Sequence, residues 1–263
     1  MIKFCSLFSG SSGNSIFISS GETKLLVDAG LSAKKIKAAL GSIGEEPGNL
    51  SAVLISHEHS DHTKGAGIMS RMFNLPVYAN ENTWKAMETE IGPVDSENRM
   101  YFETSEGFDI GDIHVKAFHI PHDASEPVGF NFFIEGKKVT TATDIGHIND
   151  ELLSCLEESE LLLLESNHDV EMLKVGPYPW NLKKRIMGDR GHLSNETAGK
   201  VIAYLAAKGT RRFLLGHLSK ENNFPELAYQ TVKNVINEEV LELCDEIMLD
   251  VVRRDQVGKV IEL

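Results

Sequence analysis

The fold of this chain is decided by the stretch Leu54-Ile55-Ser56-His57-Glu58-His59-Ser60-Asp61-His62. The apolar run from Ala52 to Ile55 predicts a buried strand. Three imidazoles and one carboxylate follow at once, and such donors suit borderline divalent ions such as Zn²⁺, Mn²⁺ or Fe²⁺. One short loop cannot wrap all four donors around a single ion, so the spacing predicts two adjacent ions. A histidine-rich surface loop without metal is the alternative, and it accounts poorly for the full His-x-His-x-Asp-His pattern.

The composition is that of an ordinary globular protein, with 41% hydrophobic and 25% charged residues. A length of 263 residues allows one domain with a sizeable core, or two closely packed halves. No apolar run approaches the roughly 18 residues of a membrane span, and the N-terminus has no signal-peptide core. We therefore expect a cytoplasmic protein that does not contact a membrane.

Cysteine usage and net charge narrow the possible partners. Cys5, Cys155 and Cys244 are far apart and odd in number, which argues against a disulfide framework or a thiolate metal site. Each is expected to be a small core residue. The net charge of −13 discourages binding of nucleic acid by the average surface. Two divalent cations would add about four positive charges at one place and reverse that expectation locally.

The order of a strand, then a polar residue, then a helix recurs along the chain. This recurrence predicts a sandwich of sheets flanked by helices, with polar residues converging at one edge of the sheets. Strands are expected at residues 2–8, 16–19, 23–27, 52–55, 76–79, 113–120, 130–134, 137–143, 161–164, 212–215, 246–252 and 260–263. Helices are expected after Ser32, at 65–73, 81–91, 194–208 and 225–235, and around residue 152. Residues 93–107 are expected to form an irregular loop.

Polar residues at the ends of other predicted strands complete the set of metal donors. A workable assignment places His57, His59 and His122 on one ion, Asp61, His62 and His217 on the other, and Asp144 between them. A carboxylate can span two ions and a neutral imidazole cannot, so Asp144 takes the bridging position. Its alternative role is to cap the turn before Gly146. A water between two such ions would have its pKa lowered from about 15.7 towards about 7, which gives a hydroxide nucleophile.

Several further residues are candidates for supporting roles. Asp28 ends a strand and could orient a ligand histidine, or merely brace its turn. Glu165 and His168 follow an apolar strand and are candidates for the same kind of support. His192 lies at a predicted helix N-terminus, and with Asp61 it is assigned to catalysis. We expect His192 to protonate the leaving oxygen or to steady developing charge, unless it is only a solvent-facing residue at the helix start.

Two segments are candidates for binding substrate. The loop Ser9 to Ser15 consists of small residues that let backbone N–H groups approach an anion, although it could equally be a flexible turn. The segment Lys174 to Arg190 combines five cations with Tyr178 and Trp180, which suits phosphates and unpaired bases. A solvated charged loop is the alternative reading of that segment. The candidate contacts are Ser11, Ser12, Asn14, Lys183, Lys184, Arg185 and Arg190.

The order of these motifs resembles that of the metallo-β-lactamase fold superfamily. The residues that carry the resemblance are Asp28 after a strand, His57-x-His59-x-Asp61-His62, His122, Asp144 and His217. The resemblance covers the whole chain. It implies a single α/β (α+β) domain, residues 1–263, folded as a four-layer αββα sandwich without a large inserted domain. It also implies two related halves, roughly 1–140 and 141–263, and a dinuclear metal site at one edge.

Within that superfamily the chain looks like the YycJ/WalJ branch, whose members are regarded as 5′ exonucleases acting on DNA. The segments that carry this closer resemblance are Ser9 to Ser15, Ile120 to Ala124, Glu165 to His168 and Gly191 to Ser194. The His192 and His217 segments are also similar to those of transfer-RNA 3′-processing nucleases. The chain has no room for the insertion of RNase J type nucleases and no long arm for transfer RNA, so DNA is expected before RNA.

The sequence therefore predicts a dinuclear metal-dependent phosphodiesterase acting on nucleic acid, with 5′ DNA exonuclease action expected. The alternatives are a hydrolase of small esters, thioesters or lactones on the same fold, and a metal-binding regulatory protein without turnover. Zn²⁺ and Mn²⁺ are the expected ions, with Fe²⁺ the third candidate. The physiological metal, strand polarity, exonuclease or endonuclease action and oligomeric state stay open.

Overall fold

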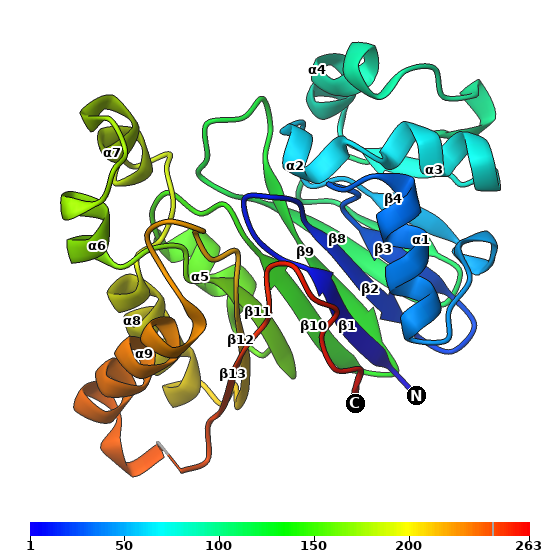
Figure 1. Ribbon diagram of the computed structural model, residues 1–263. Coiled ribbons are helices and arrows are strands. Elements are labelled where there is room, and N and C mark those ends of the chain that lie inside the picture. The colour runs from blue at the N-terminus through cyan, green and yellow to red at the C-terminus, as the bar shows by residue number, and fades with distance from the viewer. Residues whose placement is uncertain (244) are drawn as a thin grey trace.

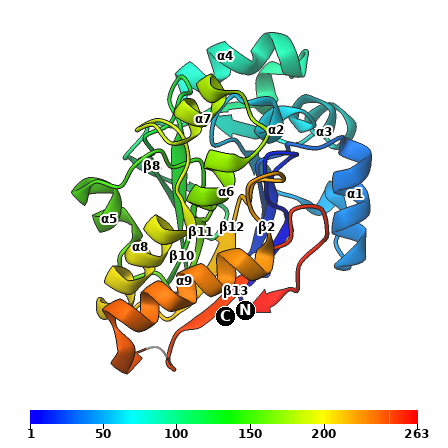
Figure 2. The same cartoon turned by 60° about the vertical axis from the view of Figure 1, so that its left-hand side comes forward.

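Two seven-stranded β-sheets pack face to face, and helices cover the outer face of each (Figure 1). The computed structural model describes residues 1–243 and 245–263. Helices α1, α3 and α4 cover one sheet, and α5, α8 and α9 cover the other, which Figure 2 shows from a second side. The predicted four-layer sandwich is confirmed.

The first sheet runs in the order β14-β1-β2-β3-β4-β5-β6 and the second in the order β13-β12-β11-β10-β9-β8-β7. The strands are β1 Lys3–Phe8, β2 Ser15–Ser19, β3 Lys24–Val27, β4 Ala52–Leu54, β5 Val77–Ala79, β6 Arg99–Tyr101, β7 Gly107–Ile110, β8 Ile113–His119, β9 Val128–Ile134, β10 Lys137–Ala142, β11 Leu161–Glu165, β12 Arg212–Gly216, β13 Met248–Val251 and β14 Ile261–Glu262. The helices are α1 Ala33–Ser42, α2 Ser60–Thr63, α3 Ala66–Phe73, α4 Glu81–Ile91, α5 Asp150–Leu156, α6 Val170–Val175, α7 Trp180–Ile186, α8 Asn195–Ala207 and α9 Pro225–Glu239.

Each sheet repeats the same plan along the chain. Antiparallel pairs come first, at β1 to β3 and at β7 to β10, and parallel pairs follow, at β3 to β6 and at β10 to β13. The change from the first sheet to the second comes between β6 and β7, whereas the resemblance implied halves of roughly 1–140 and 141–263. We infer one domain of two related halves, with β14 returning to pair with β1.

Strand alternation explains how the layers stay together. Successive side chains of a strand point to opposite faces, so an apolar run such as β11 can face two layers at once. Leu161 and Leu163 pack between the sheets with Phe130 and Phe132 of β9, whereas Leu162 and Leu164 pack under α8 and α9. All of these side chains are fully buried or nearly so, and the two apolar faces hold the metal-site strands in register.

The structure corrects several sequence-based expectations. Residues 93–107 are not an irregular loop, because β6 extends the first sheet and β7 begins at Gly107. Strand β6 is short and its side chains are partly buried or exposed, so its sequence has no apolar pattern. A contact with α4 helps to hold it, because the carbonyl of Met100 accepts the indole N–H of Trp84 at 2.8 Å. The basic segment, residues 174–190, includes the end of α6 and all of α7, and α9 continues to Glu239.

The cysteine expectations are met in part. Cys5 is buried, and burial raises the pKa of its thiol to about 11. Cys155 is only half-buried, and Cys244 lies outside the described residues. Among the described residues, no helix has both the length and the apolar character needed to cross a bilayer.

Candidate metal centre

The site lies where the carboxyl ends of parallel strands meet at one edge of the two sheets, a usual location for ligand sites in α/β folds. Three of its residues lie within two positions of a strand end and share an unusual backbone. Asp28, Asp144 and His217 have φ of 60°, 62° and 55°, in the left-handed region that costs energy for residues other than glycine. The turn at His217 is tied by its N–H, which donates to Ser9 Oγ at 2.9 Å. Such turns aim the three side chains inward.

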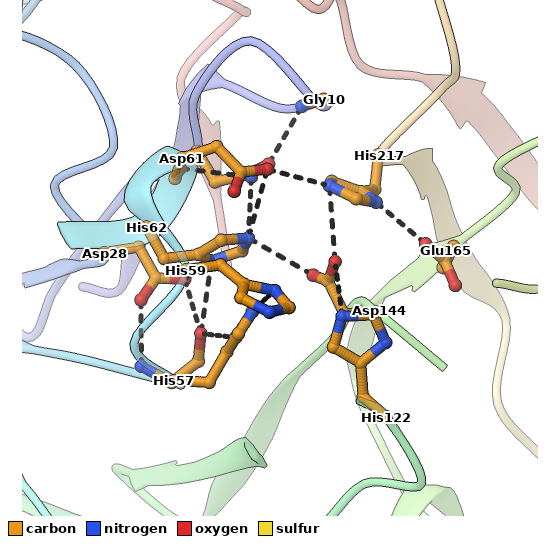
Figure 3. A network of polar contacts seen from close by, with 12 residues as sticks. Gly10, Asp28, His57, His59, Asp61, His62, His122, Asp144, Glu165 and His217 are labelled. Atoms are coloured by element: carbon orange, nitrogen blue, oxygen red, sulfur yellow. Dashed lines mark hydrogen bonds and ion pairs between the residues drawn. The ribbon is translucent and has the colours of Figure 1, made fainter. Parts of the chain in front are cut away.

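Seven side chains converge at this edge (Figure 3). The structure brings together every residue that sequence analysis assigned to the metals. One group contains His57, His59 and His122, and a second contains Asp61, His62 and His217; within each group the donor atoms lie within 4.8 Å of one another.

Asp144 lies between the two groups. Its Oδ2 is 3.3 Å from Nε2 of His62, and its Oδ1 is 3.5 Å from Nε2 of His217. Nε2 of His122 lies 3.8 Å from the same Oδ1. The carboxylate therefore faces donors from both sheets, which is the position expected for a bridging group.

Unsatisfied atoms at the centre show that these residues fit a cation. Asp144 Oδ2 and His217 Nε2 are buried and have no hydrogen-bond partner among the described residues. Leaving a buried polar atom unpaired costs about 1–3 kcal/mol, so a native site normally supplies a partner. Imidazole and carboxylate together match the preference of borderline divalent metals. The donor set is that of a divalent-metal site.

Asp28 orients His62. Nδ1 of His62 donates to Oδ2 of Asp28 at 2.7 Å, which turns Nε2 towards the centre. The backbone N–H and the hydroxyl of Ser56 both donate to the same carboxylate at 2.9 Å. A carboxylate behind a ligand histidine fixes its tautomer and ring orientation. Sequence analysis anticipated Asp28 but missed Ser56.

Glu165 does the same for two histidines. Its Oε1 accepts Nδ1–H of His217 at 2.8 Å and Nδ1–H of His192 at 2.9 Å. Its Oε2 accepts the backbone N–H groups of Ile145 and Leu193 at 2.8 and 3.0 Å. Burial alone would raise the pKa of Glu165, but the two histidines outweigh it and hold that pKa well below its usual range. Glu165 therefore stays ionised.

The metal-site histidines divide by charge environment. Burial and the neighbouring His62 and His122 hold the pKa of His57 well below its usual value, so its ring is neutral and ready to coordinate. Burial would also lower the pKa of His62, but Asp28, Asp144 and Asp61 outweigh it and raise that pKa to about 9. Carboxylates likewise hold the pKa of His217 well above normal. A cation entering the site would displace these protons.

The structure does not bring His168 into the ring of donors. Its side chain is buried and makes no hydrogen bond to the seven donors, and its Nδ1 has no partner among the described residues.

Asn14, predicted to touch substrate, is buried as well. Its Oδ1 accepts the N–H of Gly10 at 2.8 Å, and its Nδ2 lies 2.9 Å from Nε2 of His62. Asn14 therefore braces the loop, whereas Ser11 and Ser12 are exposed at its tip.

The basic segment contains one residue that the sequence misassigned. Lys183 is buried, and its ammonium donates to the carbonyls of Lys174 and Gly176, both at 2.7 Å. It closes the end of α6 and is not placed to meet a phosphate. Lys184 is exposed, with its Nζ 5.7 Å from the centre of the Trp180 ring.

Arg185 is half-exposed and connects the basic segment to the metal site. Its Nε and Nη2 donate to the two carboxylate oxygens of Asp123, with 2.9 Å for the Nη2 bond. Asp123 Oδ1 also lies 3.4 Å from Nε2 of His122. Sequence analysis named Arg185 and missed Asp123, although Asp123 directly follows a candidate ligand.

A profile of the β-lactamase superfamily domain matches residues 23–218. The chain is 44% identical over 234 residues to exodeoxyribonuclease WalJ of Streptococcus pneumoniae strain D39, covering 88% of this chain and 87% of the relative. It is 41% identical over 237 residues to exodeoxyribonuclease YycJ of Bacillus anthracis, covering 90% of each. The similarity to these relatives therefore extends over most of the chain.

Solved structures show the same fold. Zn²⁺-bound PqqB from Methylobacterium extorquens superposes with a TM-score of 0.71 at 16% identity, over 99% of this chain and 100% of that one. The short form of human tRNase Z superposes with a TM-score of 0.64 at 16% identity, with the same coverage of the two chains. At this identity the likeness concerns the fold alone.

Replacing Gly30 by alanine should dislodge the metal loop. A Cβ at Gly30 would lie 1.6 Å from the carbonyl oxygen of Asp61, which itself accepts the N–H of Asn14 at 2.8 Å. We expect a loss of about 3 kcal/mol of unfolding free energy, together with weaker metal binding. Gly41→Ala is the control, because it meets nothing within 4 Å in α1 and should stabilise the helix by about 0.5–1 kcal/mol. The test is to measure the unfolding free energy by denaturant titration and the bound metal by elemental analysis. Equal stability of the two variants would contradict the close contact between Gly30 and Asp61.

Acid should destabilise the native protein through His168. Burial lowers the pKa of His168 from 6.5 to about 4, so between these values the unfolded chain binds a proton that the folded chain does not. Stability is therefore lost as the pH falls from about 6.5 to about 4, by about 3 kcal/mol. Unfolding free energies of chelator-treated wild type and His168→Gln across this range provide the test. Parallel curves for the two proteins would refute the assignment.

Proposed function

Because this chain belongs to the β-lactamase superfamily, and two relatives that span most of it are named exodeoxyribonucleases, we propose that it is a dinuclear metal-dependent DNA exonuclease. The observation that carries the proposal is the position of Asp144, whose carboxylate faces His62 on one side and His122 and His217 on the other. Two sets of donors with a shared carboxylate suit a pair of ions better than a single one.

The proposed ligands follow the two groups of donors. His57, His59 and His122 would hold one ion, Asp61, His62 and His217 the other, and Asp144 would bridge them. Zn²⁺ and Mn²⁺ are the proposed ions, since both accept mixed imidazole and carboxylate ligands. When bound, the ions supply an activated water and a counter-charge for phosphoryl oxygens.

His192 is the proposed proton donor to the leaving oxygen. Its Nδ1 is committed to Glu165, so Nε2 is the atom free to face substrate. Its side chain keeps 15% of its surface exposed beside the buried ligands His122 and His217, which allows contact with a bound phosphodiester. Glu165 holds the ring in place through this contact, so the orientation of Nε2 is fixed.

Two features of α7 and the residues after it support DNA as the substrate class. Lys184, Arg185 and Arg190 are exposed on and after α7, and Arg185 reaches the metal site through Asp123. The exposed ring of Trp180 offers a face for an unpaired base. A hydrolase of small esters is the rival on the same fold, and it makes no use of these cations.

Loss of Asp144 should abolish turnover. Asp144→Ala removes the shared carboxylate, so we expect metal content to fall and activity to drop on the order of 10³-fold. The assay is release of mononucleotides from end-labelled DNA and RNA, with Mn²⁺ or Zn²⁺ added. Asp95→Ala, at an exposed position, is the matched control. Wild type that releases no nucleotide but hydrolyses small esters would overturn the proposal in favour of its rival.

The basic segment should set substrate affinity. The triple change of Lys184, Arg185 and Arg190 to glutamine should raise the KM for single-stranded DNA about tenfold. It should also reduce the salt dependence of binding by about 2 in the log–log slope, because each phosphate contact on a single strand contributes about 0.7. Lys34, Lys35 and Lys37, exposed on α1, give a control triple with the same charge change. An unchanged slope for the α7 triple variant would show that these cations do not contact the phosphates of the substrate.

A further inference from the structure

A second groove opens beside the metal centre, between the first turns of α9 and the segment 250–259. Its volume is about 1040 Å³, which is at the upper end of ligand pockets. In Figure 1 the segment descends in red past β1, and Figure 2 shows α9 in orange crossing close to β13. The proposed mechanism uses none of these residues.

The groove begins next to the metal centre along the chain. Leu218 and Ser219, which line it, directly follow the proposed ligand His217. Since consecutive Cα atoms are about 3.8 Å apart, the groove begins within about 8 Å of that residue along the chain. The loop of Gly10 connects the two from the other side, because a Cβ there would touch both Arg254 and the carbonyl of Leu218.

Four cations line the groove, namely Lys220, Arg253, Arg254 and Lys259. None of the four forms an ion pair with a carboxylate among the residues that the structure describes. Three carboxylates, Glu226, Asp250 and Asp255, share the lining, so the local balance is slightly positive. In a chain of net charge −13 this is an exception that favours an anionic occupant.

Two aromatic side chains accompany these cations. Phe224 and Tyr229, at the start of α9, are 47% and 38% exposed and both line the groove. Exposed aromatic rings beside unpaired cations are the combination that binds unpaired bases and their phosphates. The hydroxyl of Ser6, on the groove lining, is buried and has no hydrogen-bond partner among the described residues.

We propose that this groove holds single-stranded DNA next to the scissile bond, with bases stacked on Phe224 and Tyr229 and phosphates near Arg253 and Lys259. The inference rests on the proposed nuclease function and deepens it. The groove, together with α7, would give the metal centre substrate contacts from two directions. It would thereby make long strands better substrates than short ones.

The double variant Phe224→Ala/Tyr229→Ala tests the stacking contacts. We expect the KM for a single strand of about 20 nucleotides to rise about tenfold, with kcat unchanged. Hydrolysis of a dinucleotide, which is too short to fill the groove, should keep its wild-type rate. Tyr204→Ala is the control, because Tyr204 is 40% exposed on α8 outside the groove. Equal KM values for wild type and the double variant on the long strand would overturn the proposal.

The double variant Arg253→Gln/Lys259→Gln tests the phosphate contacts. Its binding of the same strand should show a log–log salt slope shallower by about 1.4, since two contacts are removed. Lys34→Gln/Lys37→Gln on α1 should leave the slope unchanged. If these groove variants instead alter only the molecular mass in solution, the groove is an interface between copies of the chain and the proposal is wrong.

Failure of the nuclease proposal would look different. Wild type would then cleave neither the long strand nor the dinucleotide. Fluorescence anisotropy with the same labelled strand would still report whether the groove variants weaken binding. If wild type cleaves DNA and the groove variants keep its KM and binding, only the groove proposal is refuted. If wild type does not cleave DNA and the groove variants bind it more weakly, only the nuclease proposal is refuted.

Discussion

The carboxylate of Asp144 stands between histidines that come from different sheets, and the rest of the site depends on it. His62 lies in α2, which follows β4 of the first sheet, and His122 and His217 follow strands of the second. Several buried imidazoles cannot be protonated together at low cost, and a dication cannot lie among them at low cost, unless anions are present at the same depth. Asp144 provides that charge at the centre, while Asp28 and Glu165 provide it from behind. The sandwich brings these groups to one edge, and their mutual attraction there helps to hold the two sheets together.

How much the sequence predicted depends on how local each signal is. The proposed metal donors could be grouped from the sequence because each follows a predicted strand, and strand ends collect at one edge whatever their distance along the chain. Strand β6 was missed because its pairing with β5 supplies the order that its own polar sequence does not. Lys183 was misassigned for a related reason: its partners are the carbonyls of Lys174 and Gly176, and only the bend between α6 and α7 brings them close. His168 was overestimated because position after a strand does not fix the direction of a side chain.

The groups facing inward and those facing substrate are built differently. Several proposed ligand histidines are held by a second group. Glu165 lies behind His217, and the carbonyl of Gly191 lies 3.0 Å from Nδ1 of His122. The cations of α7 and of the groove lie on exposed turns and helix faces. One fold can serve many functions, because the surfaces that contact the substrate can change while the scaffold of the site stays the same. Substrate choice in this chain should therefore be easier to alter than metal binding.

The pairing of β14 with β1 has a mechanical consequence. Lys3 lies opposite Glu262, and the N–H of Leu263 donates to the carbonyl of Ile2 at 3.0 Å, so residues 2 and 263 are neighbours. A force that pulls these two positions apart would load the hydrogen bonds of this pair one after another, as in unzipping, and not together, as in shear. Strand β14 would peel away first and release the segment 250–259 that lines the groove. The parallel strands that carry the proposed metal donors would bear the force only afterwards. Tension applied across the two ends would thus loosen the surface beside the centre before it reaches the centre itself.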